Sequence, residues 1–300
     1  MSYRAALTAL VLMVAASARA SLLVYEPFDY PVGTLAGQNA TGQNLTGTYA
    51  SGSVVPATLE LRAETFSLGY GALLGAPDFA GGRLGQNLGT TAASAIASLA
   101  GPVNIAPDGA LFFSALFLFD DSADGSHFAR IELLDQQSGD VLSFGEVVAG
   151  AMAVNVGAQT AATGGGGVSA GADGSFTNGQ VLFLFGRYQN GATPLGDRLD
   201  LVGYETNAVT QIPGGFDPTD PAAQFRFSLT GVDIDMTRID AVRFEIRGSA
   251  NNFIDELRVG TTYADVVPEP AAAPLLLGGL VCVALLGRTN RGGGARTPRA

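Results

Sequence analysis

The chain has 300 residues, with 27 acidic residues against 16 arginines and no lysine, which gives a formal net charge of −11. Nucleic acids and anionic membrane surfaces both require a basic face, so this composition argues against them as partners of the main body. A single cysteine and a single histidine exclude a disulfide framework and a multi-histidine zinc site.

The N-terminus contains the three parts of a secretory signal peptide in their usual order. Arg4 supplies a positive charge, residues 5–16 form an apolar run, and Ala18 and Ala20 form a small-residue cleavage site. The sequence therefore predicts that residues 1–20 are removed and that the rest of the chain is exported.

The body of the chain has the pattern of an all-β protein. Helical periodicity is nearly absent, and residues 90–101 are the only modest candidate for a helix. Short runs rich in branched and aromatic residues, separated by turn residues, predict strands instead. These runs are residues 110–119, 127–135, 141–148, 180–189, 198–206, 225–229 and 238–248. With no internal repeat, such a pattern favours one β-sandwich.

Two of these runs predict more than a strand. Residues 110–119 are apolar on both faces, which is typical of a central strand in a two-sheet stack. In residues 238–246 apolar Ile239, Ala241, Phe244 and Ile246 roughly alternate with charged side chains, which predicts a half-buried strand with a slip near Val242.

The acidic segment 120–125 lies between two predicted strands. Asp120, Ser122 and Asp124 stand at alternate positions before a glycine, which is the first half of a calcium-binding loop. The twelfth position of that loop is Ile131 rather than the usual glutamate. A hairpin loop that uses aspartate and glycine for turns is the alternative, and the sequence favours it.

Other polar residues are candidates for acid–base chemistry or for binding a cation. Glycoside hydrolysis requires two carboxyl groups about 5 to 10 Å apart in a cleft. Solvated strand faces and turns are the simpler explanation, because exposed carboxylates need no partner, and a lone histidine is most often a surface residue. The candidates are Asp217 with Asp220, Asp233 with Asp235, Asp255 with Glu256, and His127.

The C-terminus ends in an apolar stretch followed by arginines. Residues 271–287 carry no charge over 17 positions, which is near the lower limit for a membrane-spanning helix. The arginines behind this stretch favour a cytoplasmic end, which leaves the body outside the inner membrane. They are Arg288, Arg291, Arg296 and Arg299.

The order of Pro268-Glu269-Pro270, apolar stretch and arginines resembles the PEP-CTERM sorting signal of Gram-negative bacteria. In that family a membrane enzyme, exosortase, is thought to remove the tail near the Pro-Glu-Pro. The resemblance implies an exosortase-like partner, a temporary inner-membrane anchor, and final delivery to the cell surface or extracellular matrix. In this chain the arginines are spread through residues 288–300 rather than packed together.

Two further segments resemble concanavalin A-like (laminin G-like) jelly rolls of PEP-CTERM proteins. They are residues 22–39, which look like the opening strand, and residues 251–270, which look like the closing strand. The resemblance implies that the first and last strands lie close together. Tyr49 and Tyr263 stand where similar sequences have tryptophan, and the chain contains no tryptophan, which argues against a sugar-stacking platform.

Taken together, the sequence predicts an all-β jelly-roll sandwich over residues 21–266, preceded by a signal peptide (1–20) and followed by a sorting signal (267–300) with one transmembrane helix. The favoured function is a non-catalytic surface or matrix protein with a structural or adhesive role. The alternative is a calcium-assisted glycan-binding module with extracellular polysaccharide as partner. A glycan hydrolase or lyase is less favoured, because no catalytic set is recognisable.

Overall fold

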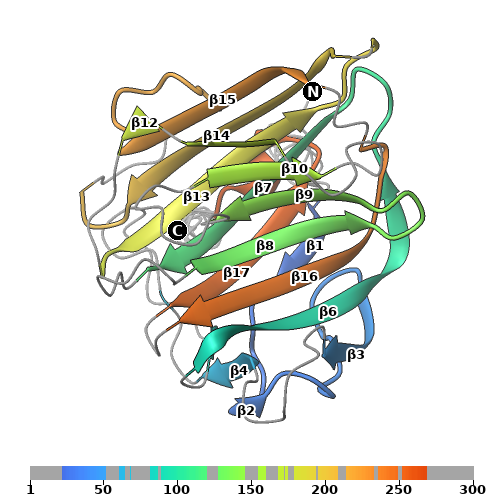
Figure 1. The fold of residues 1–300 in the computed structure, drawn as a ribbon, viewed down its shortest axis with the longest axis vertical. Helices are drawn as coiled ribbons and strands as arrows, with labels where there is room; N and C mark the ends of the chain where they lie inside the picture. The colour runs from blue at the N-terminus through green and yellow to red at the C-terminus, as the bar shows by residue number, and fades with distance from the viewer. Residues whose placement is uncertain are drawn as a thin grey trace, which may run out of the picture.

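The computed structural model describes residues 22–51, 61–64, 68, 82–86, 89–119, 128–145, 155–159, 168–171, 173–174, 179–193, 195–208, 214–232, 236–248 and 252–268. Within these residues the strands form two antiparallel sheets (Figure 1). The ten-stranded sheet contains β1 (Leu22–Glu26), β2 (Gly33–Thr34), β4 (Leu61–Glu64), β5 (Arg83–Gln86), β7 (Ala110–Leu118), β12 (Asp173–Gly174), β13 (Val181–Gln189), β14 (Asp197–Glu205), β15 (Phe225–Val232) and β17 (Phe253–Gly260). The seven-stranded sheet contains β3 (Leu45–Ser51), β6 (Gly89–Asn104), β8 (Phe128–Asp135), β9 (Asp140–Gly145), β10 (Asn155–Gln159), β11 (Val168–Gly171) and β16 (Arg238–Gly248).

Strand order shows how the ends of the chain meet. The ten-stranded sheet runs β12-β15-β14-β13-β7-β17-β5-β4-β2, and the seven-stranded sheet runs β11-β10-β9-β8-β16-β6-β3. The first strand, β1, pairs with the last strand, β17, with Leu22 opposite Gly260. The predicted all-β sandwich is therefore confirmed, and so is the prediction that its first and last strands are neighbours.

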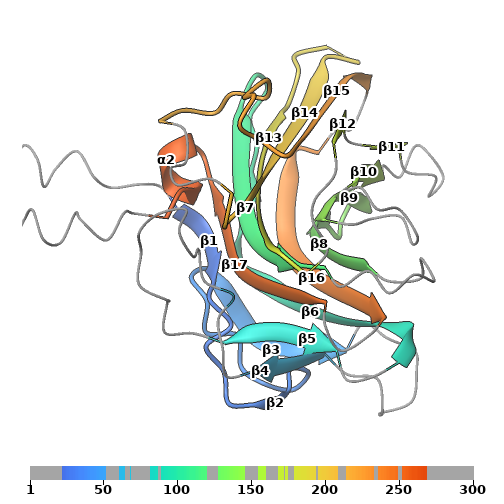
Figure 2. The ribbon, with the colours of Figure 1, turned by 90° about the vertical axis from the view of Figure 1, so that its left-hand side faces the viewer.

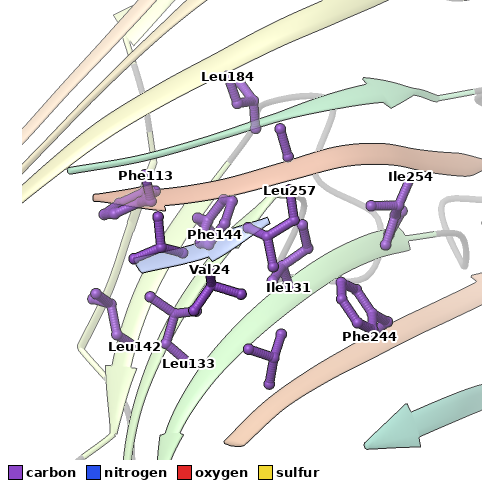
Figure 3. Close-up of a cluster of buried hydrophobic side chains, with 14 of the residues drawn as sticks. Val24, Phe113, Ile131, Leu133, Leu142, Phe144, Leu184, Phe244, Ile254 and Leu257 are labelled. Carbon is purple, nitrogen blue, oxygen red and sulfur yellow. The ribbon is translucent and has the colours of Figure 1, made fainter. Parts of the chain in front are cut away.

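The main hydrophobic core lies between the two sheets (Figure 3). Phe113 on β7 and Phe144 on β9 belong to different sheets, and their ring centroids are 4.4 Å apart. Phe28, in the segment after β1, packs edge-on against Phe244 of β16 at 5.0 Å. Alternate residues of each strand point inward, so the period of two in the sequence places the rings of Phe113, Phe144 and Phe244 in one layer.

A second, smaller cluster covers part of the outer face of the ten-stranded sheet. It contains Leu116 of β7, Phe185 of β13 and Val202 of β14, together with Val266 of the short helix α2 (Tyr263–Val266). Figure 2 shows α2 on the side of this sheet that faces away from the core. The hydroxyl of Ser114 donates to the Val266 carbonyl at 2.7 Å and ties α2 to β7. The prediction that residues 110–119 form a central strand, apolar on both faces, is confirmed.

Residues 90–101, which the sequence offered as the only helix candidate in the body, lie within strand β6, so the helix prediction is wrong. Ala93, Ala95 and Ala97 are buried in the core, while Ser94, Ile96 and Ser98 alternate with them toward the outer face. Alanine favours helices in isolation, and its small side chain gives little hydrophobic contrast between the two faces of a strand. Pairing with β16 on one side and β3 on the other overrides this local preference.

The irregularity in the strand 238–248 occurs slightly earlier than predicted. The register of β16 against β6 shifts between Ile239 and Ala241, rather than near Val242. As a result Val242, and not Ala241, joins Phe244 in the main core. A β-bulge moves every later side chain to the opposite face, so a one-residue change in its position decides which side chains join the main core, although Ala241 is buried as well.

Among the described residues, no helix is long and apolar enough to cross a membrane. The predicted signal peptide and the predicted transmembrane segment, residues 1–20 and 271–287, lie outside the described residues. Both stay predictions.

Candidate functional site

Many predicted site residues lie outside the described part of the chain and stay predictions. They are Ala18 and Ala20 of the cleavage site, Asp120, Ser122 and Asp124 of the calcium loop, His127, Asp233 and Asp235, and Glu269, Pro270, Arg288 and Arg291 of the sorting signal. Pro268 is described and is buried where the chain leaves α2. In the described residues no cluster of three or more histidine, cysteine or carboxylate side chains could hold a metal ion.

The pairing of the strands on either side of the acidic segment 120–125 shows that the hairpin interpretation of this segment is wrong. β7 pairs with β13 and β17, whereas β8 pairs with β9 and β16. The segment therefore connects the two sheets and cannot be a hairpin loop, because the arms of a hairpin pair with each other. Sequence patterns identify two consecutive strands, but they do not show whether the chain changes sheet between them.

Asp217 and Asp220 build a turn, as the simpler explanation predicts. An oxygen of Asp217 accepts hydrogen bonds from the amide and the hydroxyl of Thr219, and these bonds lower the pKa of Asp217. Asp220 accepts the hydroxyl of Tyr204 at 2.7 Å and the amide of Ala222 at 2.9 Å. Burial, and then the bond to Asp220, raise the pKa of Tyr204.

The third pair, Asp255 and Glu256, is not solvated, which corrects the prediction for these two residues. Asp255 is fully buried and accepts the amide of Leu68 at 2.8 Å, while Glu256 is 2% exposed. Glu256 has a φ of 52° at a break in the register of β17. Its carboxylate bonds Tyr25 at 3.2 Å and Arg258 at 3.1 Å. Hydrogen bonding of this kind lets a carboxylate be buried within the fold.

The outer face of the seven-stranded sheet carries a group of charges that no sequence motif indicated. Figure 2 shows that β16 and β7 bend the same way, with this outer face on the concave side. Arg130 and Glu132 on β8 stand beside Glu245 and Arg243 on β16, in the register Arg130 opposite Glu245 and Glu132 opposite Arg243. We call these four residues the Arg–Glu ladder.

One guanidinium joins both carboxylates of the ladder. Nε of Arg130 lies 3.0 Å from an oxygen of Glu132 and 3.1 Å from an oxygen of Glu245, and its Nη2 lies 2.6 Å from Glu245. Arg243 pairs with Glu132 from the other side. Since both carboxylates contact one nitrogen, these two oxygens are at most about 6 Å apart, which excludes the wider spacing of inverting glycosidases.

The ladder is charge-neutral and held rigidly. The Glu132 side chain is only 4% exposed, Glu245 is 15% exposed, and the two arginines are 23% and 31% exposed. Cross-strand ion pairs with charge-assisted hydrogen bonds fix the planar ends of all four side chains on a sheet. The arrangement can therefore present fixed donors and acceptors to a ligand, but it contains no carboxylate without an arginine partner.

Sequence patterns contained part of this signal. Arg130 and Glu132 alternate with core residues along one strand, and Arg243 and Glu245 do so along another. Alternation assigns each pair to an outer face. Neither the pairing of β8 with β16 nor the register that aligns opposite charges can be obtained from either strand alone.

Comparisons with known proteins find similar solved structures but no family match. No protein-family model matches the chain, and no curated protein matches it significantly. Among solved structures, the chain is similar to the globular domain of T. cruzi calreticulin, with 9% identity over 88% of this chain and 99% of that chain and a TM-score of 0.45.

Two other solved structures illustrate the range of similar proteins. Arcelin-5, a lectin-like defense protein from Phaseolus vulgaris, has 8% identity over 75% of this chain and 94% of that chain, with a TM-score of 0.40. A β-1,3-glucanase from Mycobacterium marinum has 12% identity over 80% and 99%, with a TM-score of 0.39. At such values the likenesses carry no argument about function, and the two-sheet architecture rests on the strand pairing.

Proposed function

We propose that this protein is an exported, non-catalytic β-sandwich that binds a glycan through the Arg–Glu ladder and acts in adhesion at the cell surface or in the extracellular matrix. The observation that carries this proposal is the ladder itself, four planar charged side chains fixed on the concave face of the seven-stranded sheet. The predicted signal peptide and the predicted PEP-CTERM tail, with exosortase as processing enzyme, supply the proposed location.

The chemistry of the ladder suits a sugar. Neighbouring hydroxyl groups on a pyranose ring present donors and acceptors at a fixed spacing, and guanidinium and carboxylate groups can bond two of them at once. Side chains that are already held in place lose little conformational entropy on binding. Ser94 opposite Glu245 and Ser143 opposite Glu132 continue the polar face onto the adjacent strands.

The same contacts favour binding over hydrolysis. A glycosidase needs one carboxyl group that carries a proton for the leaving oxygen and a second that acts as base or nucleophile. Glu132 contacts two arginines and Glu245 contacts one. Both carboxylates of the ladder are therefore engaged in ion pairs, whereas a glycosidase directs its two carboxyl groups at the scissile bond.

Replacement of Arg243 by glutamine is expected to weaken glycan binding about tenfold or more, because charge-assisted hydrogen bonds are among the stronger polar contacts. Binding of the purified protein to a glycan array, followed by titration of the best ligand, measures this effect. Arg83→Gln is the matched control, since Arg83 is 24% exposed and pairs with Glu64 on the other sheet. Equal affinity in both variants would place the binding site elsewhere.

The proposed location has a separate test. Cells that express the tagged full chain should contain it in the envelope or the external fraction, with a loss of mass at both ends after processing. The intact chain in the cytoplasm would contradict export. A Glu269→Ala variant tests the Pro-Glu-Pro motif and should accumulate in the inner membrane without loss of the tail.

A further inference from the structure

The outer face of the ten-stranded sheet carries a second charged cluster, on the opposite side of the molecule from the Arg–Glu ladder. Its centre is Asp200 on β14, which is fully buried. Arg187 on β13 bonds this carboxylate at 2.7 Å, and Arg198 bonds it at 2.8 Å. Ser228 on β15 donates its hydroxyl to the same group. One aspartate therefore holds two arginines at a fixed spacing.

Both arginines keep N–H donors that no described residue accepts. Among the described residues, Arg198 bonds only through Nε, so its two terminal nitrogens remain free, and its side chain is 40% exposed. Arg187 bonds Asp200 through one terminal nitrogen, and its buried Nε has no partner in the described structure. The ring of Phe216 lies 5.1 Å from the Arg187 guanidinium and restricts its movement. The cluster contains more donors than acceptors.

The charge of this cluster is opposite to that of the protein as a whole. Two guanidiniums surround one carboxylate, and Arg226 in the next row bonds the backbone carbonyl of Asp220 rather than a carboxylate. The whole chain, by contrast, has a net charge of −11. Long polyanions are repelled by such a body, so a local positive site fits a single anionic group better than a polymer of charges.

Neutral polar side chains surround the arginines. Gln189 lies opposite Arg198 on β13, and Thr230 lies opposite it on β15, so both belong to the same outer face. Hydroxyl and amide groups can donate to and accept from the hydroxyls of a sugar. A site for phosphate alone would gain little from these acceptors.

We propose that Arg187 and Arg198, held by Asp200, form a binding site for the carboxylate of an acidic sugar, at the end of a glycan chain or in a short oligosaccharide. The guanidiniums bind the carboxylate through their free N–H groups, and Gln189 and Thr230 bond the ring hydroxyls. This site does not depend on the Arg–Glu ladder and would remain if the ladder bound nothing.

Titration of the purified full chain with galacturonate and with galactose tests the proposal. Galacturonate is expected to bind and galactose to bind at least about tenfold more weakly, because only galacturonate offers a charged acceptor. Arg198→Gln and Arg187→Gln should each lower the affinity for galacturonate about tenfold or more. Arg238→Gln, which removes an equal charge from the seven-stranded sheet, should change it less than about twofold.

Three outcomes would overturn the proposal. They are no binding of galacturonate to the wild-type chain, equal effects of Arg238→Gln and Arg198→Gln, and binding of inorganic phosphate as tight as that of galacturonate. Thermal unfolding of each variant tests whether the fold is intact, because each substitution removes one of the two arginine partners of the buried Asp200. The glycan-array test of Arg243→Gln uses other residues, so failures of the two sites are distinguishable.

Discussion

Replacement of Glu26 by alanine is expected to destabilise the protein by about 3–5 kcal/mol, because three buried donors lose their acceptor together. Glu26 is fully buried. Its carboxylate accepts the amide of Phe28 at 2.7 Å and the hydroxyls of Tyr30 and Tyr49 at 2.7 and 2.6 Å. Chemical denaturation in urea measures the loss. Glu64→Ala is the control, since Glu64 forms a partly exposed ion pair and should cost less than about 1 kcal/mol.

Exchange of Glu26 for glutamine should change the pH dependence of stability. Burial raises the pKa of Glu26 above its ordinary value of 4.5, and the hydrogen bonds from Tyr49 and Tyr30 offset this only in part. The folded state therefore binds the proton more tightly than the unfolded state does. This contribution to stability is complete below the unfolded pKa of 4.5 and is lost as the pH rises through the folded pKa.

The wild-type protein should accordingly lose stability relative to Glu26→Gln as the pH rises from about 4 toward neutrality. Free energies of unfolding in urea at a series of pH values give this difference directly. Other carboxylates titrate in both proteins and cancel. A difference that stays constant, or that moves in favour of the wild type at higher pH, would contradict the assignment of a raised pKa.

Replacement of Gly203 by alanine is expected to destabilise the protein by about 3 kcal/mol, the upper range for an overpacked core. A Cβ at this position on β14 would lie 1.6 Å from a ring carbon of Phe225, which is 1% exposed. Neither the ring nor the paired strand can move away without disturbing the core. Thermal unfolding and urea denaturation both measure the effect.

Gly214→Ala is the matched control, because a Cβ there meets no atom within 4 Å, and its effect should be within about 0.5 kcal/mol. The double variant Gly203→Ala/Phe225→Leu adds a second test. A smaller side chain at position 225 should relieve the clash, so the double variant should be more stable than the sum of the two single effects predicts. Additive effects would show that the ring of Phe225 is not the obstacle.

The predicted strands agree closely with the structure where branched and aromatic residues are dense. The run 180–189 corresponds to β13 and the run 198–206 to β14, each within one residue. The prediction failed for β6, where alanine and serine alternate with little contrast in size or hydrophobicity. β1 and β17 were identified by resemblance, not by their pattern.

The candidate sites were harder to predict from the sequence than the strands. The carboxylate pairs chosen from the sequence lie within three positions of each other along the chain, and the described ones serve the turn at Asp217 or the buried contacts of Asp255 and Glu256. The Arg–Glu ladder instead joins residues separated by 115 positions, from Arg130 to Glu245. Proximity in sequence was therefore a poor guide to which charges face one another.

The sequence by itself determined that the runs rich in branched and aromatic residues become strands, as in β7, β13 and β14, and a period of two assigned the buried face where polar and apolar residues alternate, as in β16. Only the tertiary structure decided that the segment 120–125 connects two sheets, that α2 covers the outer face of β7, and that Arg187 and Arg198 share Asp200. Pairing and register join segments that are distant along the chain. A one-residue shift would reverse every contact, so no single strand contains that information.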